Sequence, residues 1–424
     1  MTDMKTSVAH LGGSMPYLLV LACLAGGDTA DSSPKDLILR DGFPAINDAQ
    51  RKLDRVPFAP GAPASVLLEV RQNEWIELGP TYYLRLRHFR RTKILTEAGA
   101  ADHGDYSLNL YGDWRVKEVE ARTVLPGGSI VEAAGGVFHE KSDAGFQVVT
   151  VAFPRVSKGA ILDFHITVAS DSWGVPPWQI QERLPVLESR FLLFPPEELK
   201  YRVARQRFPE DLRAEKVRLG NRDGFVWRLA DIEPLSDAPN LPPMDDISKA
   251  LYIIPEEYHD GGYVTPIARD WQSWGKHEDR FWDDWMKGGQ GDAQALAKQV
   301  AGEAASPIAK AEAVRRALRD RVRVEYLSSD PQQTSPDSVL AKGVGSSADL
   351  AGTAVAMLRA VGVDAALAAI RRRSAGTIPA EFPVPVLFND YLVRLPAGSE
   401  PAYFSPSADS PASILPWDCT GILA

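Results

Sequence analysis

Apolar and polar residues alternate along much of the chain between residues 65 and 235. The segment Thr81–Leu95 (TYYLRLRHFRRTKIL) has this two-residue period, which is typical of a strand with one buried face. Turns such as LPGG and VSKG separate it from similar segments that follow. Many short strands divided by turns predict an antiparallel β-sandwich over residues 65–235.

Two segments flank this predicted sandwich. Residues 28–64 are rich in proline and aspartate, and we expect a tether with one short helix near Ala49–Leu53. Residues 236–290 begin as a proline-rich connector and continue as an aromatic helix. Its large aromatic residues recur near the helical period: Trp271, Trp274, Phe281, Trp282 and Trp285. Such a row could stack on a ligand, but packing against a domain is the interpretation that we favour.

The pattern changes to a helical period over residues 291–424. Two amphipathic helices are predicted between Asp292 and Leu327, and Ser306–Pro307 has the composition of a helix start. The stretch GVGSSADLAGTAVAMLRAVGVDAALAAI (343–370) predicts a glycine turn, a buried helix and a strand. The helix face is expected to comprise Leu350, Ala354, Met357, Leu358 and Val361. Strands are expected over Val384–Pro396 and Ala402–Asp409, which makes this an α+β domain.

Composition excludes several classes of function. The chain has 424 residues, 45% of them hydrophobic, and a formal net charge of -9, so we expect more than one domain and no nucleic-acid partner. Its two cysteines, Cys23 and Cys419, form no CxxC pair and no cluster with histidine. We therefore expect neither a metal site nor a cofactor.

The first 27 residues have features of an export signal. Lys5 and His10 precede the apolar run MPYLLVLACLAGG, which is too short to cross a bilayer and is followed by small residues. We therefore expect a periplasmic or envelope-associated protein. VLAC is a loose match to a lipoprotein box, and Cys23 would tether the protein to a membrane if it were lipidated. A disordered leader is the alternative.

The order of these segments resembles known bacterial domains. The C-terminal part resembles the transglutaminase-like domain, a papain-like fold with a cysteine nucleophile, through SVLAKGVG, the helix AVAMLRAVGVDAALAAI and the strands containing FND and YFSPS. The part before it resembles the domain of unknown function 3857 in segments such as RRTKILTEAGA, VEARTVLPGGSIVE and VAFPRVSKGAILDFHITV.

This resemblance implies that all three catalytic positions are substituted. The family pattern Gly-Asp-Cys-Lys-Asp reads GSSAD (345–349) here, so Ser347 occupies the cysteine position. The family strand Phe-Asn-His reads FND, which places Asp390 at the histidine position. Ser405 stands where the family has its aspartate.

The substitutions remove the usual chemistry. A thiolate needs an imidazole beside it, and a carboxylate orients that imidazole. Serine ionises far less readily than cysteine, and Asp390 is a weak base unless burial raises its pKa. All seven histidines precede residue 278, so only one from outside the domain, such as His259 or His277, could act as a base.

Three functions follow from this pattern. We favour an exported non-catalytic protein that binds a peptide, glycan or protein partner. The second is an amide hydrolase or acyl transferase that uses Ser347 with Asp390 or an imported histidine. The third is a structural accessory of an envelope assembly. In the favoured case Ser347 caps the helix or is simply small, Asp349 interacts with the helix dipole, the arginines at 371–373 are solvated, and Cys419 has no catalytic role.

Overall fold

The computed structural model describes residues 37–78, 81–110, 114–141, 147–171, 174–209, 211–236 and 241–419. The predicted export signal and Cys23 lie outside the described residues. None of the described helices combines the length and apolar character needed to cross a membrane.

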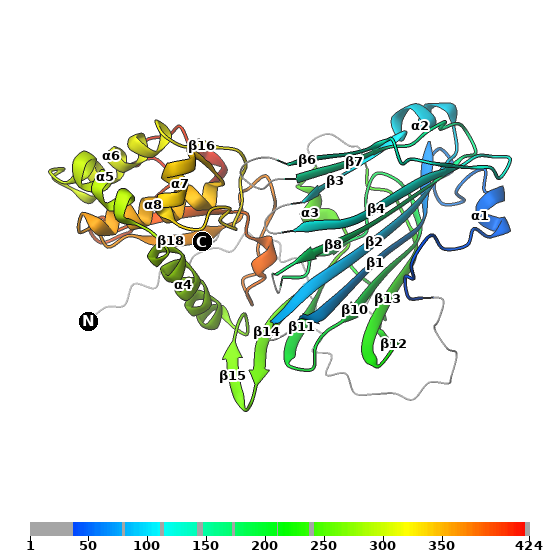
Figure 1. Ribbon diagram of the computed structural model, residues 1–424, viewed down its shortest axis with the longest axis horizontal. Helices are drawn as coiled ribbons and strands as arrows, with labels where there is room; N and C mark the ends of the chain where they lie inside the picture. The colour runs from blue at the N-terminus through cyan, green and yellow to red at the C-terminus, as the bar shows by residue number, and fades with distance from the viewer. Residues whose placement is uncertain are drawn as a thin grey trace, which may run out of the picture.

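A large twisted sheet forms the centre of the N-terminal domain (Figure 1). Its strand order is β12-β13-β10-β1-β2-β8-β4-β5. In chain order these strands are β1 (Ala64–Leu78), β2 (Thr81–Ile94), β4 (Arg115–Val124), β5 (Ile130–Glu132), β8 (Ile161–Ser170), β10 (Val186–Phe194), β12 (Glu215–Leu219) and β13 (Arg222–Ile232). Neighbours are antiparallel except β1 and β10, which are parallel. The expectation of a wholly antiparallel sandwich is therefore corrected at this one pair.

Two smaller sheets pack on one face of the large sheet. One contains β3 (Asp105–Leu110), β7 (Gln147–Ala152) and β6 (Val137–Lys141), and its apolar side chains share a core with β2, β4 and β8. The other contains β11 (Leu199–Gln206), β14 (Ala250–Asp260) and β15 (Tyr263–Pro266), with β9 (Trp178–Gln179) paired to β14. Trp178 and Leu251 from this sheet meet Phe191 and Trp227 of the large sheet. The sandwich predicted from the alternating pattern is confirmed.

Strands β14 and β15 come from residues that the sequence predicted to form a connector. Ala250–Pro255 are all buried, because β14 pairs along its length with β11. The short helix α3 (Met244–Ile247) precedes it. Residues 236–290 therefore contribute to the sandwich as well as linking it to the next domain.

The expected tether packs against the other face of the large sheet. Leu37 and Leu39 join a core with Phe89. The buried Arg91 donates to the carboxylate of Asp163 (2.7 Å) and to the carbonyl of Ala45 (3.0 Å). Helix α1 (Asp48–Lys52) forms close to the predicted position. The tether prediction is thus wrong from residue 37 onward, because the sheet presents buried polar groups that this backbone satisfies. Helix α2 (Glu97–Asp102) follows β2.

Helices and a small sheet form the C-terminal domain. The helices are α4 (Trp271–Lys287), α5 (Gly291–Ala301), α6 (Pro307–Arg319), α7 (Pro336–Lys342) and α8 (Ser347–Ala360). Strands β16 (Arg323–Val324) and β17 (Val344–Gly345) form a parallel pair, and β18 (Ala366–Ile370), β19 (Asp390–Leu395) and β20 (Ala402–Phe404) form an antiparallel sheet. Single turns of 3-10 helix occur at Pro385–Leu387 and Trp417–Cys419.

Helix α8 is the centre of this domain. Its residues from Ser347 to Leu358 are all buried, because α5, α6 and α7 surround it and β19 packs on it. Trp282 and Trp285 of α4 pack directly on Gly352, where an added Cβ would lie 2.6 Å from the Trp282 ring. The interpretation of these two tryptophans as packing residues is supported by their burial, while Trp271 at the start of α4 is exposed.

The strand expected over Val384–Pro396 is shorter than predicted. Pro385 opens a 3-10 turn and the strand begins at Asp390. Proline has no N–H to donate to a sheet ladder, which explains the late start.

Candidate functional site

The start of α8 is fixed by a capping box. Ser346 is the N-cap, and its hydroxyl accepts a hydrogen bond from the backbone N–H of Asp349 (3.3 Å). The Asp349 carboxylate in turn accepts from the N–H of Ser346 (2.8 Å). The N-cap is therefore Ser346 and the expectation that Ser347 caps the helix is corrected, because Ser346 has the extended backbone that a cap requires.

The polar groups of Ser347 are occupied by the loop before α7. Its hydroxyl accepts from the N–H of Ser328 (3.0 Å) and is within 3.3 Å of the Ser328 carbonyl, to which it can donate. Its own N–H donates to the carbonyl of Tyr326 (3.1 Å). Ser347 is only 1% exposed. A substrate would have to displace this loop before it could touch the hydroxyl.

Asp349 has a larger role than a favourable interaction with the helix dipole. Its carboxylate also accepts from the backbone N–H groups of Gln332 and Gln333 (both 3.0 Å). Burial raises the pKa of Asp349, although these hydrogen bonds to the charged form oppose the shift. The side chain therefore fastens the same loop to the helix start.

Asp390 lies at the start of β19, is fully buried and is close enough to Ser347 to interact with its hydroxyl. Its Oδ2 accepts from Nε (2.8 Å) and Nη2 (2.6 Å) of Arg372, and its Oδ1 accepts from the N–H of Tyr391 (2.8 Å). Burial raises the pKa of Asp390, while the charge of Arg372 and the nearby Ser347 hydroxyl favour the ionised form. Asp390, which the sequence places at the predicted histidine position, thus pairs with a cation.

Arg372 was not identified as a site residue from the sequence. It binds Asp418 as well as Asp390, and Arg371 next to it is bound to Asp245 (2.6 Å). Arg371 and Arg372 are 3% and 7% exposed, so the expectation that the arginine run is solvated is wrong for both. Asp390 could have indicated such a residue, because it is an acidic residue at the start of a mostly apolar strand. A carboxylate buried there needs a cationic partner.

Ser405 follows the end of β20, the strand next to β19. It is 1% exposed, and its hydroxyl is 2.9 Å from that of Ser407. Within the described part of the chain, no hydrogen bond joins Ser405 to Ser347 or Asp390. The structure therefore brings the first two predicted positions together and places the third on the neighbouring strand.

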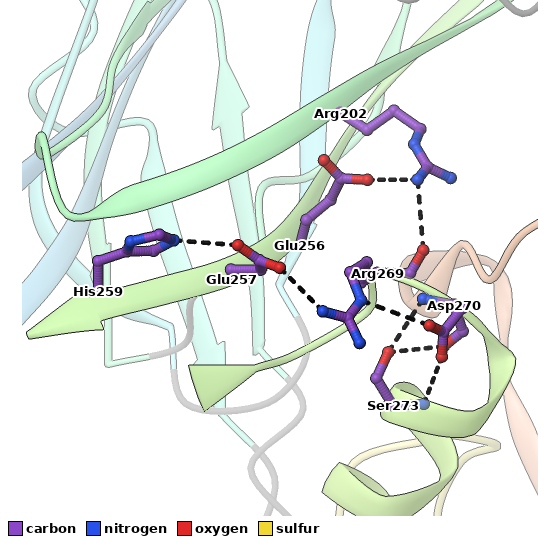
Figure 2. A network of polar contacts seen from close by, with 7 residues as sticks. All are labelled: Arg202, Glu256, Glu257, His259, Arg269, Asp270 and Ser273. Atoms are coloured by element: carbon purple, nitrogen blue, oxygen red, sulfur yellow. Dashed lines mark hydrogen bonds and ion pairs between the residues drawn. The ribbon is translucent and has the colours of Figure 1, made fainter. Parts of the chain in front are cut away.

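Neither of the two nearest histidines is engaged with Ser347. Figure 2 shows His259 within a polar network at the junction of β14 and α4, where its Nε2 lies 3.0 Å from the Glu257 carboxylate. Glu257 also accepts from Arg269 (3.2 Å), and the neighbouring Asp270 caps α4. His277 is on the exposed side of α4. Among the described residues, neither histidine has a hydrogen bond to Ser347.

An open groove of about 760 Å³ runs along this site. It is lined by Arg372, Ser407 and the exposed apolar residues Leu327, Ile414 and Trp417. Cys419 follows the lining residue Asp418, is 1% exposed and packs on Ile370 and Leu392. Burial raises the pKa of Cys419 to about 12, so its thiol stays protonated near neutral pH. The described residues contain no group of three or more metal-binding side chains.

Comparisons with known families match both halves of the chain. Residues 294–385 match the model of the transglutaminase-like superfamily, and residues 85–236 match the domain of unknown function 3857 (DUF3857). No curated protein matches the sequence.

One solved structure has a similar fold over most of the chain. A crystal structure described as a "putative protease" from Parabacteroides distasonis superposes with a TM-score of 0.64 at 16% identity, covering 82% of this chain and 68% of that one. An M1 zinc metallopeptidase from Deinococcus radiodurans gives a TM-score of 0.26 at 11% identity, covering 49% of this chain and 48% of that one. The first likeness concerns the fold alone, and the second is too weak to support an argument.

Proposed function

Because the chain consists of a DUF3857 domain followed by a transglutaminase-like domain, we propose that it is an exported, non-catalytic member of this architecture. In this proposal the groove beside α8 binds a peptide, glycan or protein partner in the cell envelope. The fold is retained as a binding scaffold and the chemistry of the family is lost.

The observation that carries the proposal is the ion pair between Asp390 and Arg372. A general base must be free to take a proton from the nucleophile, and Asp390 instead holds a guanidinium through two hydrogen bonds. Arginine does not lose its proton in proteins, so the guanidinium stays charged and continues to donate to Asp390. The cysteine and histidine of an active relative can exchange a proton. The Asp390–Arg372 pair cannot perform this proton transfer.

The closed environment of Ser347 supports the same conclusion. Both its hydroxyl and its N–H are bound to the loop at Tyr326–Ser328. A helix N-terminal N–H is the type of donor that stabilises an oxyanion, and here it is already occupied. The serine thus stabilises a loop conformation and leaves no open position for an acyl group.

The groove itself supports a binding role. Leu327, Ile414 and Trp417 are 44%, 54% and 75% exposed, and all three lie on the same groove. Large apolar side chains that are gathered on one exposed surface are typical of interaction sites. Trp417 offers a flat ring for stacking on a sugar or a peptide side chain.

One observation favours the second candidate, an amide hydrolase or acyl transferase that uses Ser347. The Ser347 hydroxyl is close enough to influence Asp390, and burial raises the pKa of that carboxyl, which makes it a stronger base. This candidate requires that Arg372 release Asp390 during turnover.

An assay of amide hydrolysis and acyl transfer by the purified protein separates the two candidates. We expect no turnover by the wild-type protein and none by Ser347→Cys alone, because catalytic triad members act as a unit. The smallest variant expected to gain activity is Ser347→Cys with Asp390→His and Ser405→Asp, and circular dichroism would establish that it is folded. Wild-type turnover that disappears in Ser347→Ala would overturn the proposal and support the serine mechanism.

Export is tested separately with a reporter fused after residue 60. We expect the fusion to cross the inner membrane, since the leader combines an early positive charge, a short apolar core and small residues. Deleting residues 1–27 is the matched control and should abolish transport. Equal retention of both fusions inside the cell would contradict this part of the proposal.

A further inference from the structure

A second hollow lies at the opposite end of the molecule from the groove. It has a volume of about 230 Å³ and is formed by the end of α1, the end of β2 and the turns that flank β4 and β8. Figure 1 shows α1 at the end of the large sheet that is remote from the C-terminal helices. We call this hollow the Lys93 pocket, after its most buried charged residue.

Lys93 is a buried cation held by backbone carbonyl groups. Its side chain is 4% exposed, and its Nζ donates to the carbonyls of Arg51 (2.9 Å) and Gly159 (2.7 Å). Within the described part of the chain, no Asp or Glu lies within ion-pair distance of it. Burial lowers the pKa of Lys93, and the positive charge of Arg51 lowers it further.

The remaining charged residues of the pocket increase this imbalance. Arg51, Lys52 and Lys158 also line it, and Asp54 is the one acidic residue among the lining residues. Lys52 has a distant contact with Asp48 (4.0 Å), whereas Arg51 and Lys158 have no ion pair among the described residues. Four cations and one carboxylate leave an excess of positive charge in a protein whose net charge is -9.

The walls of the pocket determine which anions fit. Val124 and Ile161 belong to a small apolar core with Leu53, and all three residues line the pocket. A water molecule occupies about 30 Å³ in the liquid, so the hollow has room for a phosphate group together with a few attached atoms. A phosphate group carries more than one negative charge, and both Lys and Arg side chains bind it well.

We propose that the Lys93 pocket binds the phosphate group of a small phosphorylated ligand, either a soluble phosphate ester or a lipid headgroup. The anion would supply the negative charge that the protein itself does not place beside Lys93. The apolar wall would contact the organic part of the ligand. This site is independent of the groove and of the proposed loss of catalysis.

The test uses the full chain, with glycerol phosphate as the soluble probe and phosphatidylcholine vesicles with or without phosphatidylglycerol as the lipid probe. Isothermal titration should show saturable binding of glycerol phosphate that weakens as salt is added. Arg51→Gln and Lys158→Gln should each weaken it by roughly tenfold, the effect of losing one charge-assisted hydrogen bond. Both residues are exposed, so these variants should fold normally.

Lys216→Gln is the matched control, because Lys216 is an exposed cation on β12 at the far edge of the same sheet. It should leave binding unchanged. Saturable binding of glycerol phosphate that depends on Arg51 supports a soluble ligand, and Arg51-dependent binding to the anionic vesicles alone supports a headgroup. Absence of binding to both probes, or equal weakening by Arg51→Gln and Lys216→Gln, would overturn the proposal.

Discussion

Arg372 in the C-terminal domain and Lys93 in the sandwich are both buried cations, but their surroundings differ. Arg372 meets the carboxylates of Asp390 and Asp418. Among the described residues, Lys93 meets only the carbonyl oxygens of Arg51 and Gly159, at the edge of a hollow. The first cation is neutralised within the protein, while the second keeps an uncompensated charge beside open space.

This difference separates a structural charge from a candidate binding charge. A buried ion pair fixes the side chains that form it, and loss of one partner is costly because the other remains buried and charged. The Arg372 pair therefore fixes Asp390, the residue at the predicted histidine position, in a structural contact. A buried ammonium held by neutral groups has already lost hydration without gaining a counter-ion, so an external anion can still stabilise it.

The largest expected effect is at the paired cation. Asp390→Asn should lower the free energy of unfolding by about 3 kcal/mol, since Arg372 would remain buried with Asp418 as its sole carboxylate partner. Urea denaturation measures this change. Asp409→Asn is the control, because Asp409 is 92% exposed where it pairs with Arg319, and it should cost less than about 1 kcal/mol. Similar losses of unfolding free energy in both variants would show that the buried ion pair contributes no more than the exposed one.

Glu69 is the reverse case, a buried carboxylate that is surrounded by cationic residues. Burial raises the pKa of Glu69, but the hydrogen bond with His88 and the charges of Arg71 and Arg90 outweigh it and hold the pKa at about 2. The folded pKa lies below the usual 4.5, so the stabilisation is present above pH 4.5 and is lost as the pH falls toward 2.

We expect this loss to reach about 3 kcal/mol between those limits. The lowered pKa of His88 acts in the same direction, because the unfolded chain takes up its proton first below pH 6.5. Urea denaturation at a series of pH values measures the slope, and Glu69→Gln should flatten it below pH 4.5. A wild-type slope that Glu69→Gln leaves intact would assign the effect to other carboxylates.

The smallest expected effect is at the unpaired cation. Lys93→Met should change the free energy of unfolding by no more than about 1 kcal/mol without phosphate, because relief of the buried charge offsets the two lost hydrogen bonds to carbonyls. Thermal unfolding with and without glycerol phosphate is the measurement. The wild-type protein should gain stability from the ligand and the variant should not. A loss as large as that of Asp390→Asn would show that Lys93 is a structural cation of the same kind as Arg372.

The sequence by itself determined the class of each domain, and the substituted catalytic positions remain a prediction from its motifs. Alternation over Thr81–Leu95 and helical spacing over residues 347–360 are local patterns, and local periodicity reflects which face of an element is buried. The prediction that Ser347, Asp390 and Ser405 occupy catalytic positions rests on short motifs, which are also local.

Only the tertiary structure decided which charges are neutralised. Arg91 meets Asp163 and Arg372 meets Asp418 across 72 and 46 residues of sequence, and residues 37–53 are held on the sheet by such contacts. The parallel pairing of β1 with β10 and the addition of β14 to β11 are likewise long-range. Periodicity tells which side of a strand is buried and carries no information about the partner that it meets there. The pairing of Arg372, and the lack of an acidic partner for Lys93 in the part of the chain that the structure describes, therefore depend on how distant segments pack.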